Sequence, residues 1–450
     1  MTEKRAQFAT RLGVIATTVG SAVGLGNIWR FPYEAGVHGG GAFLLIDLFF
    51  IFIIGVPVVC AEFIIGRHTG ANVRGAFKML APGKPWGIVS YLGILASILI
   101  LSFYSVVAGW TLEYIGQSLS DFSGIHSPEG LHRQFDIFAQ SNWRPAMWTV
   151  IFLLCNYLIL SRGVQKGIEK MSNIMMPMLF VILIAFSINS LTMPSAAEGL
   201  SFLFKPDFSK VTPSVLIGGM GQAFFSLSLG LGCLITYSSY FKRETPLVKT
   251  AFITAGLDTL VALLAGIIIF PAVFTFGEEP AAGPKLVFEI LPSIFSNLPG
   301  GMIWSTLFFV LLFLASLTST ISMSEISIAY FQEEFGMSRR KATWLNIGIA
   351  MVLGIICALS FGMLSDFTIC GLTVFNLFDY LSSNILLPVG GLIISIFVGW
   401  ILDRAIVQRE LVTVNPGRTT TICVRLIVFC LRYLAPLCIA AVFIFGLGLF

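Results

Sequence analysis

Apolar stretches of about twenty residues recur along the 450 residues of this chain, and this repetition limits the possible folds more than any other feature. A helix of that length crosses a hydrocarbon core about 30 Å thick. Backbone polar groups in lipid must be paired within the segment, and the alternation typical of barrel strands is absent, so the stretches should be helices. Only 11% of the residues are charged, against about a quarter in a soluble domain. We therefore predict an all-α, polytopic membrane protein.

Hydropathy and the positions of glycine and proline divide the chain into eleven predicted transmembrane helices. Their ranges are 12–36, 41–65, 87–117, 146–162, 173–192, 214–241, 249–276, 301–334, 342–361, 372–403 and 422–449. We interpret residues 1–450 as one transmembrane domain, with a first repeat of five helices at about 8–192, a second at about 214–404, and an extra helix at about 422–449.

Lysine and arginine are distributed unevenly over the segments between these helices. If the N-terminus is cytoplasmic, the inner segments hold twenty of them and the outer segments five. Because cytoplasmic loops carry such an excess, we expect a multi-pass protein of the cell's inner (plasma) membrane, with the N-terminus in the cytoplasm and the C-terminus outside. The formal net charge of +4 follows from this asymmetry, so we expect the lipid bilayer and no nucleic acid as a partner. The polar start, MTEKRAQF, predicts no removable signal peptide.

Two of the predicted helices contain Gly-Leu-Gly at their centre, among small hydroxylated residues. They read VGSAVGLGN over residues 19–27 and GQAFFSLSLGLG over residues 221–232. Glycine costs roughly 1 kcal/mol relative to alanine in a helix interior, so several close together favour an opening of the helix. The alternative is a packing face of small residues, since Gly20 and Gly24 also form a GxxxG pattern.

The positions of these two helices favour the opening. They are the first and sixth, which correspond if the helices form two repeats of five, and an odd number per repeat inverts the second repeat in the membrane. Interrupted helices in matching positions indicate a transporter with its binding site near the midplane. An opened helix offers free N–H groups to a carboxylate and free carbonyls to a cation or an ammonium group. A zwitterionic amino acid satisfies both ends, so we predict that the chain carries such a solute.

Charged and hydroxylated side chains also lie inside the predicted helices. A charge at mid-span costs about 2.5 to 3.5 kcal/mol, so Asp258, within an apolar run, is either a fixed charge beside a cation site or a hydrogen-bond partner between helices. The hydroxyls of ASLTST, residues 315–320, suit an alkali cation or simply bond back to their own helix. Arg30 either pairs with an acid such as Asp379 or extends to the headgroups. The other acidic residues inside predicted helices are Asp47, Glu62 and Glu325.

Several long motifs resemble the neurotransmitter:sodium symporter family. They are ATRLGVIATTVGSAVGLGNIWRFPYEAGVHGGGAF, the Gly66-Arg67 end of the second span, GQAFFSLSLGLG and ASLTST. The likeness runs from about Arg5 through the tenth span and includes bacterial amino-acid symporters with eleven helices. It implies two inverted five-helix repeats with broken first and sixth helices. It also implies sodium-coupled symport by alternating access, with no enzymatic activity.

The resemblance implies two sodium sites. The first would use Ala22, Asn27, Ser226 and Asp258 together with the substrate carboxylate. The second would use Gly20, Val23, Ala315, Thr318 and Ser319.

The resemblance also implies a substrate site between the two breaks. The substrate carboxylate would meet the Gly26 amide and the Tyr104 hydroxyl, and the ammonium group would face the carbonyls of Ala22, Phe225 and Ser226. The side-chain pocket would consist of Ile100, Tyr104, Phe225, Ser228, Leu231, Ser319 and Met323.

Gates on both sides of this site follow from the same resemblance. Arg30 with Asp379 would form the outer gate, and Arg5 with Glu333 would form the inner gate. The ring of Phe225 would cover the substrate.

Departures from the family pattern narrow the prediction. Members that carry monoamines have an aspartate at the position of Gly24, so the glycine in this substrate site implies amino acids proper. Chloride-dependent members have asparagine at Asp258, serine at Ala262 and tyrosine at Asp47. Because a carboxylate at Asp258 or Asp47 can supply the charge that chloride would bring, we predict chloride-independent transport, with proton antiport left open.

The predicted side-chain pocket contains no charged residue, which favours a neutral, hydrophobic or aromatic amino acid. Leu231 and the flexible Met323 leave room for larger side chains. A sodium-coupled carrier of another zwitterion, such as a betaine or γ-aminobutyrate, and a membrane sensor that binds its amino acid without moving it are the alternatives. A channel would need a continuous hydrophilic lining, and an enzyme a catalytic arrangement; the sequence lacks both. The preferred amino acid, the stoichiometry and the oligomeric state stay open.

Overall fold

The computed structural model describes residues 6–125, 127–277, 286–296, 299–412 and 418–448. Nearly all regular structure in this part is helical, which confirms the predicted class. The exception is one antiparallel hairpin, in which β1 (Thr368–Ile369) pairs with β2 (Leu372–Thr373).

The helices that correspond to predicted spans include several single turns of other helix types, labelled η. In chain order they are α1 (Arg11–Ala22), η1 (Gly26–Arg30), α2 (Phe31–Val37), α3 (Gly41–Phe50), η2 (Ile51–Gly55), α4 (Val56–Thr69), η3 (Pro85–Gly87), α6 (Ile88–Leu119), α8 (Arg144–Leu160), η5 (Val164–Glu169), α9 (Lys170–Ser190), α11 (Pro213–Ser226), α12 (Cys233–Ser238), α13 (Leu247–Phe276), α15 (Gly301–Phe335), α16 (Arg339–Leu359), α17 (Val374–Tyr380), η8 (Leu381–Leu386), α18 (Leu387–Ile396), η9 (Phe397–Ile401), α20 (Arg418–Phe429), η10 (Cys430–Leu434) and α21 (Ala435–Gly446).

Shorter helices join these spans, and the hydropathy pattern did not predict them because they are brief. They are α5 (Val73–Leu80), η4 (Asp121–Gly124), α7 (Pro128–Ala139), α10 (Ala196–Phe204), η6 (Phe208–Lys210), η7 (Leu286–Ile290), α14 (Leu291–Ser296) and α19 (Arg404–Leu411).

Within the described residues, eight helices are long and apolar enough to cross a membrane, or ten if each of two bent pairs counts as one span. The first pair is α1 with the helix Gly26–Val37, bent by 54°, and the second joins α7 to α8 with a bend of 75°. The predicted span 214–241 lies outside this count because α11 and α12 are each short and residues 227–232 separate them. The two inverted repeats stay a prediction.

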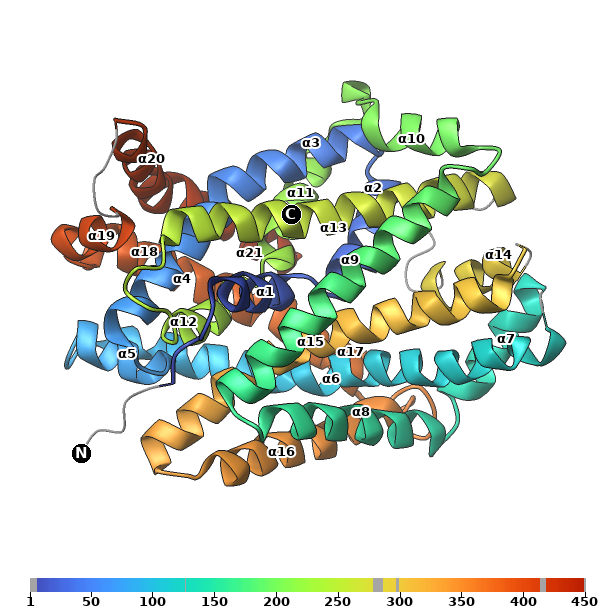
Figure 1. Ribbon diagram of the computed structural model, residues 1–450, viewed down its shortest axis with the longest axis horizontal. Helices are drawn as coiled ribbons and strands as arrows, with labels where there is room; N and C mark the ends of the chain where they lie inside the picture. The colour runs from blue at the N-terminus through green and yellow to red at the C-terminus, as the bar shows by residue number, and fades with distance from the viewer. Residues whose placement is uncertain (1–5, 126, 278–285, 297–298, 413–417, 449–450) are drawn as a thin grey trace.

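The spanning helices run along the long axis of the molecule (Figure 1). The helices α5 and α19 lie at one end, and α7 and α14 lie at the other. Between the ends, α15 packs along α6 and also contacts α1, α9 and α12. The middle of α15, from Leu314 to Ala329, is buried. The long α15 is therefore a continuous support against which the interrupted helices pack.

The fifth span begins earlier than predicted, at Val164 instead of residue 173. Its first turns contain Lys166, Glu169 and Lys170, which lower the local hydropathy. The buried carboxylate of Glu169 accepts hydrogen bonds from the amides of Ala9 and Thr10, at 2.8 and 3.0 Å. This polar turn therefore fastens the start of α1, a tertiary contact that a hydropathy pattern does not contain.

Candidate functional site

The first span opens at its predicted break. At Val23 the backbone leaves the helix with ψ of 120°, and the helix resumes only after Leu25. Side chains bond the freed amides: Gly24 N donates to Asn27 Oδ1 at 3.0 Å, and Leu25 N donates to the Tyr104 hydroxyl at 2.9 Å. The opened helix, one of the two alternatives for this segment, is therefore the one the structure adopts.

The sixth span opens over residues 227–232. Ser228, Gly230 and Gly232 have positive φ values of 53°, 82° and 81°. A Cβ on Gly230 would lie 2.3 Å from the carbonyl oxygen of Leu387, so only glycine fits there. The hydroxyl of Ser228 donates to the carbonyl of Ser21 at 3.1 Å, which brings the two interrupted helices together.

Glu62 holds the second break, a role that the sequence reasoning missed. This residue of α4 is fully buried, and its Oε1 accepts the hydrogen bond of Gly230 N at 2.9 Å. The sequence showed only an acidic residue inside the second span. A signal was present, because the glycine-rich break must leave amides without helical partners and a buried carboxylate can accept from them.

Asn27, Ser226 and Asp258 form one buried cluster, as predicted for the first sodium site. Asn27 Nδ2 lies 2.8 Å from Asp258 Oδ1 and 3.0 Å from Ser226 Oγ, and Ser226 Oγ donates to Asp258 Oδ2 at 2.5 Å. Asn27 and Asp258 are wholly inaccessible to solvent. The cluster thus brings a carboxylate, a hydroxyl and an amide side chain together, although the Asn27 atom that meets Asp258 is Nδ2 and its Oδ1 accepts from Gly24 N. Oxygens of these three groups are the ligands that an alkali cation takes.

The residues predicted for the second sodium site join α1 to α15. Ser319 Oγ donates to the carbonyl of Val23 at 2.9 Å, and a Cβ on Gly20 would lie 3.3 Å from Thr318 Cβ. The hydroxyl of Thr318 bonds back to the carbonyl of Ala315 at 3.0 Å, as a threonine in a helix commonly does. The five residues are therefore neighbours, while the role of the Thr318 hydroxyl stays a prediction.

One cavity between the two breaks contacts every residue predicted for the substrate. It is lined by Ala22, Gly24, Gly26, Ile100, Tyr104, Phe225, Ser226, Ser228, Leu231, Ser319 and Met323, and also by Phe103 and Leu387. Phe103 and Leu387 were not predicted, since nothing in the sequence distinguishes them from other apolar residues of their helices. At Gly24 a Cβ would lie 2.6 Å from Ser319 Oγ, so the cavity leaves no space there for a larger residue.

A second, wider cavity adjoins the first on the side of Arg30. It shares Gly26, Phe103, Tyr104 and Phe225 with the first, and both predicted outer-gate residues, Arg30 and Asp379, line it. We call it the vestibule.

The outer-gate pair does not meet in this structure. Arg30 instead lies 3.7 Å from Glu34, with its guanidinium 4.2 Å from the centre of the Phe225 ring. Asp379 accepts a hydrogen bond from Ser383 at 2.9 Å. Phe225 lines both the cavity and the vestibule. The outer gate and the covering role of the Phe225 ring stay predictions.

The residues predicted for the inner gate, and Asp47, are the remaining predicted positions. Arg5 lies outside the described residues, and Glu333 accepts hydrogen bonds from the backbone and side-chain amides of Asn72, at 2.8 and 2.9 Å. Asp47 is buried on α3. Among the described residues, Asp47 Oδ1 has no hydrogen-bond partner.

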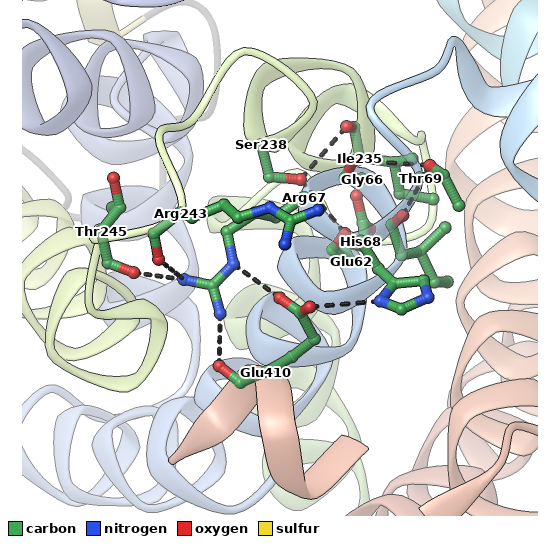
Figure 2. A network of polar contacts seen from close by, with 11 residues as sticks. Glu62, Gly66, Arg67, His68, Thr69, Ile235, Ser238, Arg243, Thr245 and Glu410 are labelled. Carbon is green, nitrogen blue, oxygen red and sulfur yellow. Dashed lines mark hydrogen bonds and ion pairs between the residues drawn. The ribbon is translucent and has the colours of Figure 1, made fainter. Parts of the chain in front are cut away.

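The Gly66-Arg67 motif lies near the end of α4, a helix that contacts both α5 and α19. These two helices lie at one end of the molecule (Figure 1). Figure 2 shows Arg67 between α19 and the loop after α12, with Nε 2.6 Å from Glu410 Oε2. Its other nitrogens donate to the carbonyls of Glu410 and Thr245. His68 Nδ1 lies 3.1 Å from Glu410 Oε1. These contacts join three separate segments of the chain. We call them the inner network, because the distribution of basic residues predicts that this end faces the cytoplasm.

Comparison with known proteins gives matches over almost the whole chain. Residues 5–124 and 129–450 match the family described as the sodium:neurotransmitter symporter family. An uncharacterized sodium-dependent transporter of Haemophilus influenzae is 39% identical over 457 aligned residues, and the transporter YhdH of Bacillus subtilis is 38% identical over 448. In both cases the match covers 99% of each chain.

Among solved structures, MhsT in complex with L-phenylalanine matches with a TM-score of 0.90. The two chains are 44% identical, and the match covers 98% of this chain and 100% of MhsT. Together with the two broken helices, these matches show that the chain belongs to the sodium:neurotransmitter symporter family, whose members are sodium-dependent membrane transporters and not enzymes.

Proposed function

We propose that this protein is a symporter that carries a neutral, hydrophobic or aromatic amino acid together with sodium, by alternating access. The observation that most supports this proposal is the cavity between the two opened helices, which is lined by all eleven residues expected to bind substrate. The orientation of the chain, with its N-terminus in the cytoplasm, is part of the proposal and rests on the distribution of basic residues.

The polar ends of an amino acid find partners at the first break. Gly24, Gly26 and the Tyr104 hydroxyl surround one side of the cavity, where N–H and O–H donors suit a carboxylate. The carbonyl side of the break, at Ala22, faces Phe225 and Ser226 across the cavity and suits the ammonium group.

The rest of the cavity favours an apolar side chain. Among the described residues that line it, none is acidic or basic, and Ile100, Phe103, Leu231, Met323 and Leu387 supply apolar surface. A charged substrate side chain would lose its hydration there without a partner. The binding of L-phenylalanine by MhsT, with 44% identity to this chain, also supports an aromatic or large aliphatic substrate.

Sodium would neutralise the buried charge of Asp258. Asn27 and Ser226 supply neutral oxygen donors beside this carboxylate, and Asp258 with Asp47 provides the negative charge that chloride would otherwise bring. The donor chemistry of the Ser319 and Val23 pair suits a second ion between α1 and α15. We therefore propose two sodium ions and no chloride requirement.

Uptake of labelled L-phenylalanine into proteoliposomes tests this function. We expect accumulation driven by an inward sodium gradient, competition by leucine and tryptophan, and none by glutamate or lysine. The Asn27→Ala variant should lose uptake, because it removes a side chain that contacts both Gly24 and Asp258.

Asn156→Ala is the matched control, since Asn156 is equally buried and, among the described residues, bonds only to Phe152 of its own helix. Binding without sodium-driven accumulation or counterflow would make the protein a sensor. Competition by a betaine, with no effect of amino acids, would contradict the proposed substrate.

A further inference from the structure

A pocket with three arginines lies far from the substrate cavity. It is formed where η9 ends, between α19 and the helix pair α20 and η10, and its lining includes Arg404, Arg425, Arg432, Gly399, Val407 and Val424. Neither the predicted transport machinery nor the inner network of Figure 2 uses these arginines.

The three guanidinium groups lack acidic partners. Within the described part of the chain, no carboxylate forms an ion pair with Arg432, which is partly buried, or with Arg404 and Arg425, which are exposed. Several partly buried arginines elsewhere do have an acidic partner. Arg67, Arg144 and Arg339 are bound to Glu410, Glu113 and Glu325, respectively. Three like charges that line one pocket repel one another, so an anion from outside the chain would stabilise the pocket.

One of these arginines is already fixed in position. Arg432 Nε donates to the carbonyl of Gly399 at 2.6 Å, and the guanidinium lies 5.5 Å from the centre of the Trp400 ring. Trp400 Nε1 donates in turn to the carbonyl of Arg432 at 2.9 Å. Among the described residues, the terminal nitrogens of Arg432 have no hydrogen-bond partner, so they can bind a ligand in the paired geometry that guanidinium groups offer to phosphate.

The surroundings of the pocket are those of a membrane interface. Trp400 and Tyr433 stack edge to face with ring centres 5.5 Å apart, and their side chains are 53% and 45% exposed. Leu426 and Phe429, from the same side, are 57% and 50% exposed. Aromatic residues gather at the depth of lipid headgroups, and apolar residues beside them suit acyl chains.

The pocket lies at the end of the bundle that also holds α5 and α19 (Figure 1). The distribution of basic residues assigns this end to the cytoplasm, where the leaflet carries anionic lipids. Basic pockets between transmembrane helices on that side suit phosphate-bearing headgroups.

We propose that the pocket formed by Arg404, Arg425 and Arg432 binds a phosphate group, with an anionic phospholipid such as phosphatidylglycerol as its source. The proposal uses the predicted orientation and is independent of which solute is transported. The helix α19 connects this pocket to the inner network, because its Arg404 lines the pocket and its Glu410 pairs with Arg67. A bound headgroup would therefore stabilise α19 in the position where it meets Arg67.

Native mass spectrometry of the full-length protein, titrated in detergent with phosphatidylglycerol or phosphatidylcholine, tests this site. The test variant is Arg404→Gln with Arg425→Gln, which keeps Arg432 and its bond to Gly399. We expect one phosphatidylglycerol to bind the wild type preferentially and the variant to bind it about thirty-fold more weakly, from the value of each basic residue near an anionic surface.

The matched control is Arg340→Gln with Arg409→Gln, which removes two exposed arginines of the same end that do not line the pocket. We expect this control to bind phosphatidylglycerol as the wild type does. If both double variants lose the same phosphatidylglycerol affinity, the loss comes from net charge and the proposed site is wrong. Equal phosphatidylglycerol binding by the wild type and both variants would also contradict it. Sodium-dependent phenylalanine binding, unchanged in both variants, would show that they are folded.

A competition experiment with inorganic phosphate distinguishes a phospholipid headgroup from free phosphate as the ligand. Titrated alone, inorganic phosphate should displace phosphatidylglycerol only at concentrations far above those of the lipid, because it lacks acyl chains to contact Leu426 and Phe429. Displacement at equal concentration would overturn the lipid as the source and leave a site for soluble phosphate.

Discussion

Two clusters of this protein, one half-buried and one fully buried, are built around a carboxylate but differ in how its charge is balanced. In the inner network, Glu410 contacts the guanidinium of Arg67 at 2.6 Å (Figure 2). In the central cluster, Asp258 accepts hydrogen bonds from Asn27 and Ser226, and both donors are neutral. Among the described residues, no cationic side chain forms an ion pair with Asp258.

The difference explains what each cluster can do. An ion pair such as Arg67 with Glu410 is complete without a ligand, so it serves as a fixed joint between segments. A buried carboxylate with only neutral partners carries a large desolvation cost that a cation would relieve. We infer that the central cluster is built for a mobile ion, and the following experiments test the contrast.

Replacing Asp258 should have the largest effect. The Coulomb attraction between a carboxylate and a sodium ion about 4 Å apart is about 4 kcal/mol in a partly polar interior. Asp258→Ala should therefore weaken sodium binding by at least about a hundredfold. Sodium-dependent binding of phenylalanine in a scintillation assay measures this. The companion variant Asp258→Asn keeps the shape and removes the charge; if it binds sodium as the wild type does, charge is not the cause.

Thr318→Ala should have a smaller effect, because it removes one neutral oxygen. Loss of a bond to a charged group costs about 1.5 to 3 kcal/mol, so sodium affinity should fall by about tenfold or more. The same binding assay applies. Thr320→Ala is the control, since the Thr320 hydroxyl is buried on the same helix and bonds back to Ser316 at 2.9 Å. Equal effects of both variants would mean that Thr318 only supports its helix.

Arg67→Gln should change stability and leave sodium affinity within about twofold of the wild type. It removes one partner of a half-buried ion pair and leaves Glu410 without its cation, which should lower the thermal midpoint by a few degrees. A thermal-shift assay with and without sodium measures both quantities. Arg243→Gln is the control, because Arg243 offers only its backbone carbonyl to Arg67. A large loss of sodium affinity would show that the two clusters are coupled.

Replacing chloride by gluconate should have no effect. We propose that Asp258 and Asp47 supply the negative charge that chloride would otherwise bring, so the rate of sodium-driven uptake should stay the same. Uptake in proteoliposomes with both salts gives the answer, and a strict requirement for chloride would show that these carboxylates do not take its place.

Much of this arrangement could be predicted from local features of the sequence. The apolar stretches located the spans, and the clustered glycines located both openings. The motifs of the first and sixth spans placed Asn27 and Ser226 in one predicted sodium site, and those of the first and eighth spans placed Val23 and Ser319 in the other. The structure brings the members of each pair into hydrogen-bond contact. The match to the family made this possible, because spacing alone left the packing-face and hydrogen-bond alternatives open.

Other contacts could not be predicted because they depend on which helices lie side by side. Glu62 was recognised as a buried charge, but its bond to Gly230 joins residues far apart in the chain. Arg30 was expected to meet Asp379, yet it lies near Glu34, one helical turn away. Fixed side-chain partners of this kind follow from the distances between helices in one conformation.

The sequence by itself determined which segments enter the membrane and where two of them open, since hydropathy and the backbone cost of glycine are properties of the local chain. Only the tertiary structure decided which groups satisfy the opened backbone: the Tyr104 hydroxyl for Leu25 and the Glu62 carboxylate for Gly230. The same holds for the arginines, of which Arg67 has an acidic partner and the three of the pocket beside α19 have none among the described residues. The physical reason is that a hydrogen bond or ion pair requires atoms within about 3 to 4 Å, and only packing sets that distance.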